Sequence, residues 1–268
     1  MAHYHIQNTQ AHHAPALAEL QRTVFPTLSD SERMAAPHYL RHIELFPEGQ
    51  IVAQHGERVI ASSSSIRHSF PQENHRFLDV SGQLWLDTHQ PDGDWLYGMD
   101  LGVHPDYRGR GIARAIYQAR RDLCHRLGLR GQVIVGMLNG YAAFSEKMSV
   151  VEYFDRLMRH ELSDPTISAQ VRIGFEPLHL MPDYLDDPQC GNAGVLMRWE
   201  MMNDESRNAD TDAVSSHPNR LNPSNPINHP IGSITSCSSP PPTPARPLGS
   251  TTATCKPSSP ASSAGWKA

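Results

Sequence analysis

The sequence makes sparse use of cysteine: its 268 residues include only four, Cys124, Cys190, Cys237 and Cys255, and no two of them have a Cys-x-x-Cys spacing. We therefore expect no disulfide framework, and this usage is typical of a reducing compartment. Long hydrophobic runs are missing, and the N-terminus has neither the basic start nor the apolar stretch of a signal peptide. These absences predict a cytoplasmic protein that does not enter a membrane.

Positive charge is not in excess. The chain carries 23 Lys and Arg residues against 28 Asp and Glu residues, a formal net charge of -5. Nucleic-acid-binding domains are typically basic, so we expect no nucleic-acid partner. The 16 histidines also lack a metal-binding pattern, because only His38 and His42 have helical i, i+4 spacing and no cysteine or carboxylate pattern completes a site around them. We expect no metal.

The last quarter of the chain has no apolar pattern. Residues 203–268 consist mainly of Ser, Pro, Thr, Asn and Ala, and they hold 11 of the 22 prolines. Such a composition cannot bury enough apolar surface to offset the entropy lost on folding. The sequence therefore predicts one folded domain over residues 1–202, followed by a disordered Ser/Pro-rich tail over residues 203–268.

Segments typical of strands and helices alternate within residues 1–202. The expected strands are 3–8, two around a turn at His55-Gly56, 94–103 and 132–137, and the expected helices are 14–25, 31–46 with a kink or break at Pro37, 111–129 and 149–162. Residues 94–137 make a strand, a loop, a helix and a strand, which normally form a right-handed crossover between parallel strands. The expected fold class is α/β.

The loop before the helix at 111–129 is rich in glycine and arginine. Residues 104–115 read HPDYRGRGIARA, with Gly109 and Gly111 next to Arg108 and Arg110. The first amides of a helix have no partner inside the helix and attract anions, and glycine lets a ligand approach them closely. The pattern indicates a phosphate or pyrophosphate site, although a solvated turn also fits an isolated Arg-Gly repeat.

Two other phosphate-binding motifs do not fit this loop. A dinucleotide fingerprint that starts at Gly109 needs glycine where the chain has Arg114. A P-loop needs Gly-Lys followed by Ser or Thr, which is missing here. What remains is the pattern Arg or Gln, any, any, Gly, any, Gly or Ala, which residues 108–113 match.

With that pattern, the stretch DLGVHPDYRGRGIARAIYQARRDL resembles the coenzyme A pyrophosphate loop of the GNAT superfamily of acyl-CoA-dependent N-acyltransferases. The resemblance covers most of residues 1–202. It implies a mixed, largely antiparallel sheet with a central pair of parallel, splayed strands, flanked by helices. It also implies acetyl-CoA as cosubstrate, no metal, and direct transfer of the acetyl group to a primary amine of a small molecule or peptide.

A closer resemblance is to the acetyltransferase-like domain that precedes a carbon-nitrogen hydrolase domain in certain two-domain bacterial proteins. The stretches RHIELFPEGQIVA and HELSDPTISAQVRIGFEP carry it. A hydrolase of that class needs a further globular stretch with a Glu, Lys and Cys set, so we do not expect nitrile or amide hydrolysis from this chain. The alternative to an acetyltransferase is a non-catalytic acyl-CoA-binding regulatory module of a former fusion, and a homodimer is compatible with either.

The resemblance also implies which residues bind the cofactor. The backbone at the end of the strand 94–103 is expected to bind the acyl and pantetheine portion, and Gly102 makes that approach sterically easy. The loop is expected to bind the pyrophosphate. The cofactor-binding residues are therefore expected to be Leu101, Gly102, Val103, Arg108, Gly109, Arg110, Gly111, Ile112 and Ala113.

Acetyl transfer needs a neutral amine and a proton source for the departing thiolate. Asp100 is the candidate base, directly or through water, and a purely structural carboxylate is the alternative. In many relatives a tyrosine stands four residues before a Gly-Phe pair, but here Gln170 has that place. Tyr141 and Tyr153 are the candidate acids, and packing under an inserted segment is the alternative for both.

The inserted segment lies between the strand at 132–137 and the Gly174-Phe175 pair. Ser149 and Glu152 have capping-box spacing and start the helix expected over 149–162. This helix either shapes an acceptor pocket or only covers the sheet.

Overall fold

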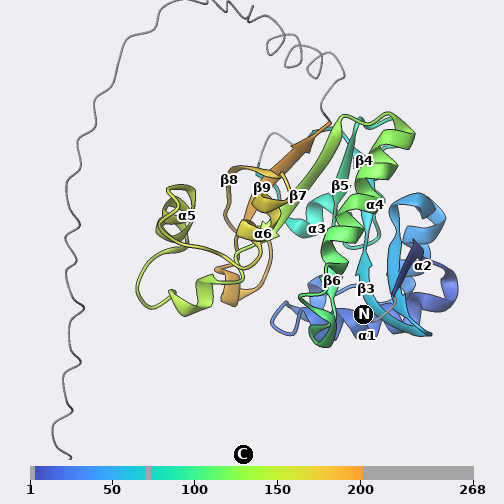
Figure 1. The fold of residues 1–268 in the computed structure, drawn as a ribbon, viewed down its shortest axis with the longest axis horizontal. Coiled ribbons are helices and arrows are strands. Elements are labelled where there is room, and N and C mark those ends of the chain that lie inside the picture. The colour runs from blue at the N-terminus through green and yellow to red at the C-terminus, as the bar shows by residue number, and fades with distance from the viewer. Residues whose placement is uncertain (1–3, 71–73, 202–268) are drawn as a thin grey trace, which may run out of the picture. The chain divides into compact units, whose positions relative to one another are not determined.

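The computed structural model describes residues 4–70 and 74–201. Four strands pair in the order β1-β2-β3-β6 and five in the order β4-β5-β7-β9-β8 (Figure 1). Among these strands β5 and β7 pair in parallel, and every other pair is antiparallel. The predicted mixed sheet with a central parallel pair is thus confirmed. The strand bounds are β1 (His5–Asn8), β2 (Ile51–His55), β3 (Arg58–Ser63), β4 (Ser65–His68), β5 (Trp95–Gly98), β6 (Gly102–Val103), β7 (Gly131–Met137), β8 (Glu176–Met181) and β9 (Gly194–Glu200).

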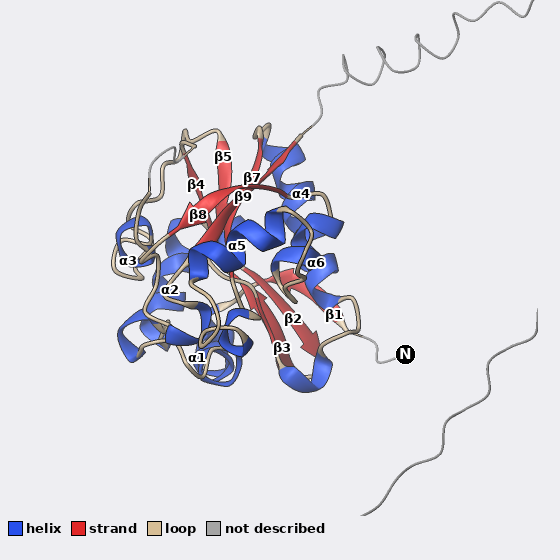
Figure 2. Ribbon diagram, turned by 90° about the vertical axis from the view of Figure 1, so that its left-hand side faces the viewer, coloured by secondary structure: helices blue, strands red, loops and turns tan. Residues whose placement is uncertain are grey.

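Helices cover both faces of the strands. Figure 2 shows α1 and α2 on one side and α4 on the other. Both sides are covered because each helix has an apolar stripe that must be buried against the sheet. The α-helices of the described residues are α1 (Ala14–Val24), α2 (Ala36–Leu45), α3 (Phe77–Val80), α4 (Ile112–Leu127), α5 (Val150–Met158) and α6 (Ile167–Arg172).

Helix α4 follows the predicted apolar stripe. Ile112, Ile116 and Leu123 are buried against the strands. Gly128 ends the helix with a φ of 63°, a left-handed conformation that favours glycine and satisfies the last carbonyls. The stripe therefore fixes which face of α4 meets the sheet, and the two ends of the helix fall where the sequence predicts them.

The strand predicted over 94–103 is interrupted in the structure. It is divided into β5 and β6, and the amides of Met99 and Asp100 both approach the carbonyl oxygen of Ser64, at 2.9 and 3.5 Å. Two residues opposite one are the mark of a bulge, which bends the strand and redirects the residues after it. The last pair between β5 and β7 is Gly98 with Ile134. Beyond it, β6 pairs with β3 instead, so the second half of β7 parts from its parallel neighbour.

Proline sets the start of α2. The sequence predicts a helix over 31–46 with a kink or break at Pro37, and the structure shows that α2 begins only at Ala36, with Pro37 in its first turn. Proline is well tolerated there because the first amides of a helix have no acceptor within the helix. The break is thus confirmed, and the α-helix predicted for residues 31–35 is wrong.

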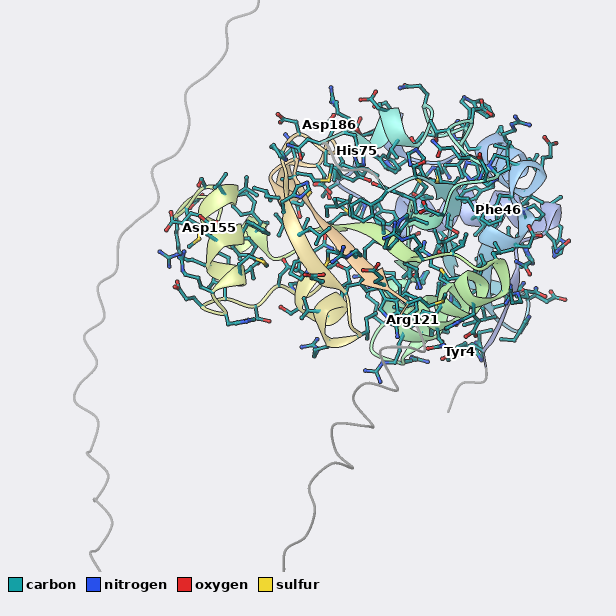
Figure 3. All side chains as sticks on the ribbon, turned by 90° about the horizontal axis from the view of Figure 1, so that it is seen from above. Tyr4, Phe46, His75, Arg121, Asp155 and Asp186 are labelled. Atoms are coloured by element: carbon teal, nitrogen blue, oxygen red, sulfur yellow. The ribbon has the colours of Figure 1, made fainter. Side chains whose placement is uncertain are left out.

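The inserted segment forms the predicted helix α5. The Ser149 hydroxyl accepts a hydrogen bond from the Glu152 amide at 3.2 Å and caps the helix. Figure 3 shows Asp155 of α5 on the opposite side of the described part from Phe46. No helix of residues 4–70 and 74–201 is long and apolar enough to cross a membrane. The tail predicted over 203–268 lies outside the described residues.

Candidate functional site

The glycine-rich loop joins β6 to α4 in a left-handed backbone conformation. Gly109 has a φ of 74° and Gly111, the residue before the helix, a φ of 80°. A Cβ atom built on either glycine would meet no protein atom within 4 Å. Side chains at these positions would therefore be disfavoured by backbone conformation rather than by a clash. The space in front of both glycines is open to a ligand.

The amides of this loop have no partner among the residues that the structure describes. The first hydrogen bond of α4 is donated by the Ala115 amide to the Gly111 carbonyl at 3.0 Å. No residue that the structure describes accepts a hydrogen bond from the amides of residues 109–114. Free amides at the positive end of a helix dipole bind phosphate groups. The loop is thus suited to bind phosphate, and the pyrophosphate site stays a prediction.

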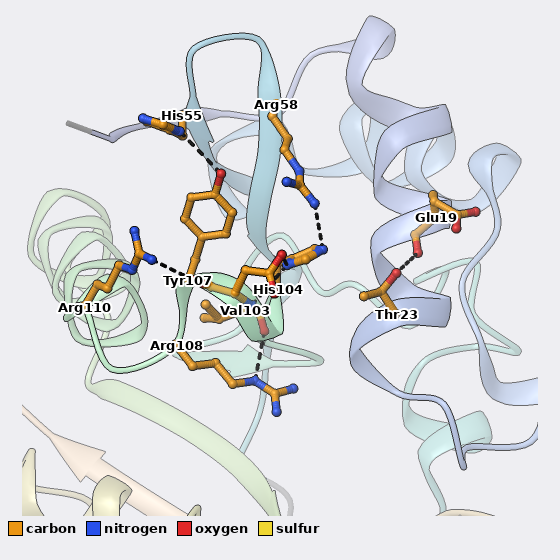
Figure 4. A network of polar contacts seen from close by, with 10 residues as sticks. Glu19, Thr23, His55, Arg58, Val103, His104, Tyr107, Arg108 and Arg110 are labelled. Atoms are coloured by element: carbon orange, nitrogen blue, oxygen red, sulfur yellow. Dashed lines mark hydrogen bonds and ion pairs between the residues drawn. The ribbon is translucent and has the colours of Figure 1, made fainter. Parts of the chain in front are cut away.

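The two arginines of the loop point to opposite sides (Figure 4). Arg108 donates from Nε to the Val103 carbonyl at 3.2 Å, and Arg110 donates from Nη2 to the Asp106 carbonyl at 2.9 Å. Each arginine thus uses one of its nitrogens to bond a carbonyl oxygen of the polypeptide backbone. Because a guanidinium has five N–H donors, each keeps further donors for an anion.

Tyr107 fixes the loop to the hairpin of β2 and β3. The guanidinium carbons of Arg58 and Arg110 lie 5.5 and 5.1 Å from its ring centroid, which is the geometry of a cation–π contact. Its hydroxyl lies 3.3 Å from Nδ1 of His55 (Figure 4). Sequence analysis missed this contact, for which the only local signal is the aromatic residue beside the Arg-Gly repeat.

Asp100 sits in the strand break and ties three elements together. Its Oδ1 accepts the Ser64 amide at 2.6 Å, and its Oδ2 accepts Nε2 of Gln21, from α1, also at 2.6 Å. Burial raises the pKa of this carboxyl above its ordinary value, and the Ser64 amide, the Arg120 charge and Gln21 counteract the rise. The carboxylate therefore has a structural function, whereas the predicted function as a base stays a prediction.

Arg120 reaches the same break from α4. Its side chain is only 1% exposed, and Nη2 donates to the carbonyl oxygens of Ser64 at 3.0 Å and Asp100 at 2.5 Å. A Cβ atom on Gly98 would collide with Nη1 of Arg120, so glycine at this position leaves room for the guanidinium where it lies. The sequence analysis missed Arg120. The sequence contained a signal for it, because this arginine stands between Ile116 and Leu123 on the apolar stripe of α4, where a charged residue is unusual.

The residues predicted to bind the acyl portion come directly after the break. Gly102 and Val103 pair with Ser62 and Ala61 of β3. The amide of Leu101 donates to no acceptor in the described part of the chain. A free amide in an interrupted strand, beside the stretch where β7 has lost its parallel neighbour, is suited to polarise a carbonyl oxygen.

The two candidate tyrosines lie together in the inserted segment. The Tyr141 hydroxyl donates to the Met148 carbonyl at 3.2 Å, and the Tyr153 hydroxyl donates to the Asp164 carboxylate at 3.1 Å. Their ring centroids are 5.6 Å apart. Burial, followed by the Asp164 charge, raises the pKa of Tyr153. These bonds hold the insertion in place, and the catalytic role of either tyrosine stays a prediction.

Gln170, which stands where many relatives have tyrosine, is buried on α6. Its Nε2 donates to the hydroxyl of Tyr117, on α4, at 3.0 Å. Its Oε1 is buried and has no hydrogen-bond partner among the described residues. A Cβ atom on Gly136 of β7 would collide with this oxygen. The side chain thus covers β7 beyond its last pair with β5.

Metal-ligating side chains do not gather in the described part of the chain. No group of three His, Cys, Asp or Glu residues there is arranged to hold a metal ion. His42 is buried, with Nε2 at 2.6 Å from the Leu84 carbonyl, and burial lowers its pKa to about 4. His38 accepts the Ala35 amide through Nδ1 at 3.0 Å. Both histidines serve the start and the packing of α2.

The structure is an α/β domain in which two parallel strands part at a bulge and an open glycine-rich loop precedes the helix between them. Residues 14–144 match the family model described as "Acetyltransferase (GNAT) family". The chain therefore contains a domain of the GNAT acetyltransferase family, as the sequence predicts.

Two curated proteins of Bacillus subtilis (strain 168) are similar in sequence. "Probable hydrolase YhcX" is 34% identical over 197 residues, which make up 72% of this chain and 38% of that protein. "Uncharacterized N-acetyltransferase YkwB" is 29% identical over 187 residues, or 69% of this chain and 83% of that protein. The chain thus spans well under half the length of YhcX and most of the length of YkwB.

Solved structures agree on the fold. The loading GNATL domain of CurA from Lyngbya majuscula superposes with a TM-score of 0.64 at 19% identity, covering 74% of this chain and 98% of that chain. The GphF GNAT-like decarboxylase in complex with isobutyryl-CoA gives 0.61 at 18% identity, covering 73% and 98%. At such identities the likeness shows the GNAT-like fold alone.

Proposed function

We propose that this chain is an acetyl-CoA-dependent N-acetyltransferase that moves the acetyl group directly to a primary amine of a small molecule or peptide. The observation that carries the proposal is the row of amides at residues 109–114, which have no partner within residues 4–70 and 74–201, beside two glycines with positive φ. Arg108 and Arg110 add positive charge to this row. The pyrophosphate of CoA has the charge and shape that such a loop binds. The family match and the similarity to YkwB, named an N-acetyltransferase, support the reaction class.

The strand break supplies the second part of the site. With the pyrophosphate on the loop, the pantetheine arm runs toward Val103, Gly102 and Leu101, the residues between the loop and the break. The unpartnered Leu101 amide then donates to the thioester oxygen and stabilises the negative charge that develops there. Ile112 and Ala113 contribute amides to the pyrophosphate. The solved neighbour GphF, named in complex with isobutyryl-CoA, supports a CoA thioester as the cosubstrate.

The reaction can be tested without knowing the acceptor in advance. Thiol release from acetyl-CoA is measured with the whole chain for each member of a panel of primary amines and peptides. The same reaction without an amine is the control. We expect amine-dependent release and an acetylated product of the corresponding mass. Tight binding of CoA with no release for any amine would instead support the regulatory module.

Two observations favour the second candidate function, a non-catalytic regulatory module that binds acyl-CoA. Gln170 replaces the usual tyrosine, and the chain is similar to YhcX, a longer protein named a probable hydrolase, over only 38% of that protein's length. A module that binds acyl-CoA without turning it over needs the loop but no proton donor. The same thiol-release assay separates the two candidates.

Asp100→Asn tests the proposed base. Asparagine keeps an oxygen for the Ser64 amide, and the Gln21 amide can rotate to meet its new NH₂ group, so the break is retained. If the carboxylate removes a proton from the ammonium form of the amine and so produces the neutral nucleophile, we expect kcat to fall in Asp100→Asn by about 100-fold, the usual size of a general-base contribution, with the Kd for acetyl-CoA within about twofold. Kinetics from pH 6 to pH 9 and calorimetry check this. An unchanged kcat over that range would leave Asp100 with its structural function alone.

A further inference from the structure

A tyrosine hydroxyl does lie beside position 170, but it comes from a different helix. Tyr117 of α4 is buried, and its hydroxyl oxygen accepts the hydrogen bond from Gln170 at 3.0 Å. The ring packs edge-on against Phe175, with the centroids 5.2 Å apart. The family tyrosine would project from α6, whereas here α6 supplies the amide and α4 supplies the phenol.

This pair lies beside the open stretch of β7. Gly136 is beyond the last pair between β5 and β7, and Oε1 of Gln170 covers it. That oxygen is buried and has no partner in the described part of the chain. Buried acceptors in proteins are nearly always paired, so this oxygen is available to a donor that a ligand brings to the open stretch of β7. The pantetheine arm of CoA carries two amide N–H groups of the right kind.

The proton of the Tyr117 phenol is also uncommitted. The oxygen accepts from Gln170, and no described residue accepts the O–H in return. The two tyrosines considered from the sequence differ in this respect, because Tyr141 donates to a carbonyl and Tyr153 to a carboxylate. Of these three hydroxyls, only that of Tyr117 donates to no described acceptor. It lies close to the place where β5 and β7 separate.

We propose that Tyr117 is the proton donor to the sulfur of CoA, held in place by Gln170, which also accepts an amide of the pantetheine arm. The inference rests on the proposed acetyl transfer. The amine nitrogen forms the new C–N bond, the electrons of the C–S bond go to sulfur, and sulfur takes the phenolic proton. The nitrogen then loses a proton to the tyrosinate, so amine and acetyl-CoA give amide and CoA thiol with the protein unchanged.

The surroundings keep the phenol in the form a donor needs. Burial raises the pKa of Tyr117, and the Arg120 charge and the Gln170 hydrogen bond only partly offset this, so the hydroxyl is protonated at neutral pH. The guanidinium carbon of Arg120 lies 5.7 Å from the ring centroid. A cation at that distance stabilises the short-lived tyrosinate.

The decisive measurement is the acidity of the CoA thiol when it is bound. The whole chain saturated with CoA is titrated, the thiolate is followed by its ultraviolet absorbance, and the titration with desulfo-CoA is subtracted to remove the protein's own tyrosines and thiols. A donor on sulfur favours the thiolate, so we expect the bound thiol to become about tenfold less acidic in Tyr117→Phe. Tyr141→Phe and Tyr153→Phe, which remove the two other candidate acids, are titrated in the same way, and we expect their bound thiol to be as acidic as in the unmodified chain.

Turnover gives the second reading. In Tyr117→Phe we expect kcat to fall by about 100-fold with the KM for acetyl-CoA within about twofold. Equal thiol acidity in Tyr117→Phe and the unmodified chain would overturn the assignment while leaving the proposed function intact. Absence of CoA binding to the unmodified chain would remove the proposed function, and this inference with it. A loss of thiol acidity in Tyr153→Phe or Tyr141→Phe instead would transfer the role to that residue.

Discussion

Gly111→Val is expected to weaken CoA binding by about 100-fold, the largest effect of any single substitution in the loop. Gly111 has a φ of 80°, which costs a β-branched residue on the order of 1–2 kcal/mol. In addition, the valine side chain would fill the open space in front of the free amides of residues 109–114, where the pyrophosphate is proposed to lie. The strain favours a relaxed loop in the free protein and the side chain obstructs the ligand, so both effects weaken CoA binding.

The other end of the same helix offers a matched control. Gly128 has a φ of 63°, and a Cβ atom there would also meet nothing within 4 Å. Gly128→Val therefore introduces similar backbone strain far from the loop. We expect both variants to lose a similar amount of stability in thermal unfolding, and only Gly111→Val to lose CoA affinity in calorimetry.

Three ligands identify the group that the loop binds. CoA and dephospho-CoA keep the pyrophosphate and should lose affinity alike in Gly111→Val, whereas pantetheine should bind weakly to every variant. If pantetheine binds the unmodified chain as tightly as CoA does, or if Gly128→Val loses as much CoA affinity as Gly111→Val, the loop is not a phosphate site. The acetyl transfer proposal would then lose its main support.

The loop could be predicted from the sequence because its causes are local. Gly109, Gly111 and the start of α4 lie within a few residues of one another, and the helix dipole needs no distant partner. The same holds for the capped start of α5 and the glycine end of α4. In each case a short pattern determines a backbone conformation.

The strand break could not be predicted in this way. Met99 and Leu101 continue the alternation of apolar residues across it, so the period of two gives no sign that the strand is interrupted. Its causes are long-range, since Gln21 of α1, Arg120 of α4 and Ser64, between β3 and β4, all meet Asp100. The contact between Gln170 and Tyr117 is of the same kind, because it spans 53 positions of the chain.

Arg120→Met should have the largest effect on stability among the residues of the break. It removes a guanidinium that is 1% exposed and compensates the buried carboxylate of Asp100, and it takes the donor from the Asp100 carbonyl. Methionine fills much of the same volume, so the cost is mainly electrostatic. We expect the free energy of unfolding to fall by about 3 kcal/mol at pH 7, measured by denaturant unfolding.

The double variant with Asp100→Asn separates charge from packing. Each single variant leaves one buried charge without its partner, whereas the double variant leaves neither. Its loss of stability should therefore be smaller than the sum of the two single losses by about 1 kcal/mol or more. A matched surface pair provides the control: Arg156 and Glu152, 2.8 Å apart and half exposed on α5, should show a coupling of only about 0.3–0.5 kcal/mol.

The pH dependence of Arg120→Met is set by the direction of the Asp100 shift. Burial already raises the pKa of this carboxyl in the folded chain, and loss of the Arg120 charge raises it further. A carboxyl whose pKa is higher in the folded than in the unfolded state binds more protons when the chain is folded. The free energy of unfolding therefore falls as the pH rises from the unfolded-state pKa to the folded-state pKa. The deficit of Arg120→Met should therefore be smaller at pH 5 than at pH 8. A deficit that is the same at both pH values would mean that Arg120 contributes packing and carbonyl hydrogen bonds, and that its charge does not compensate Asp100.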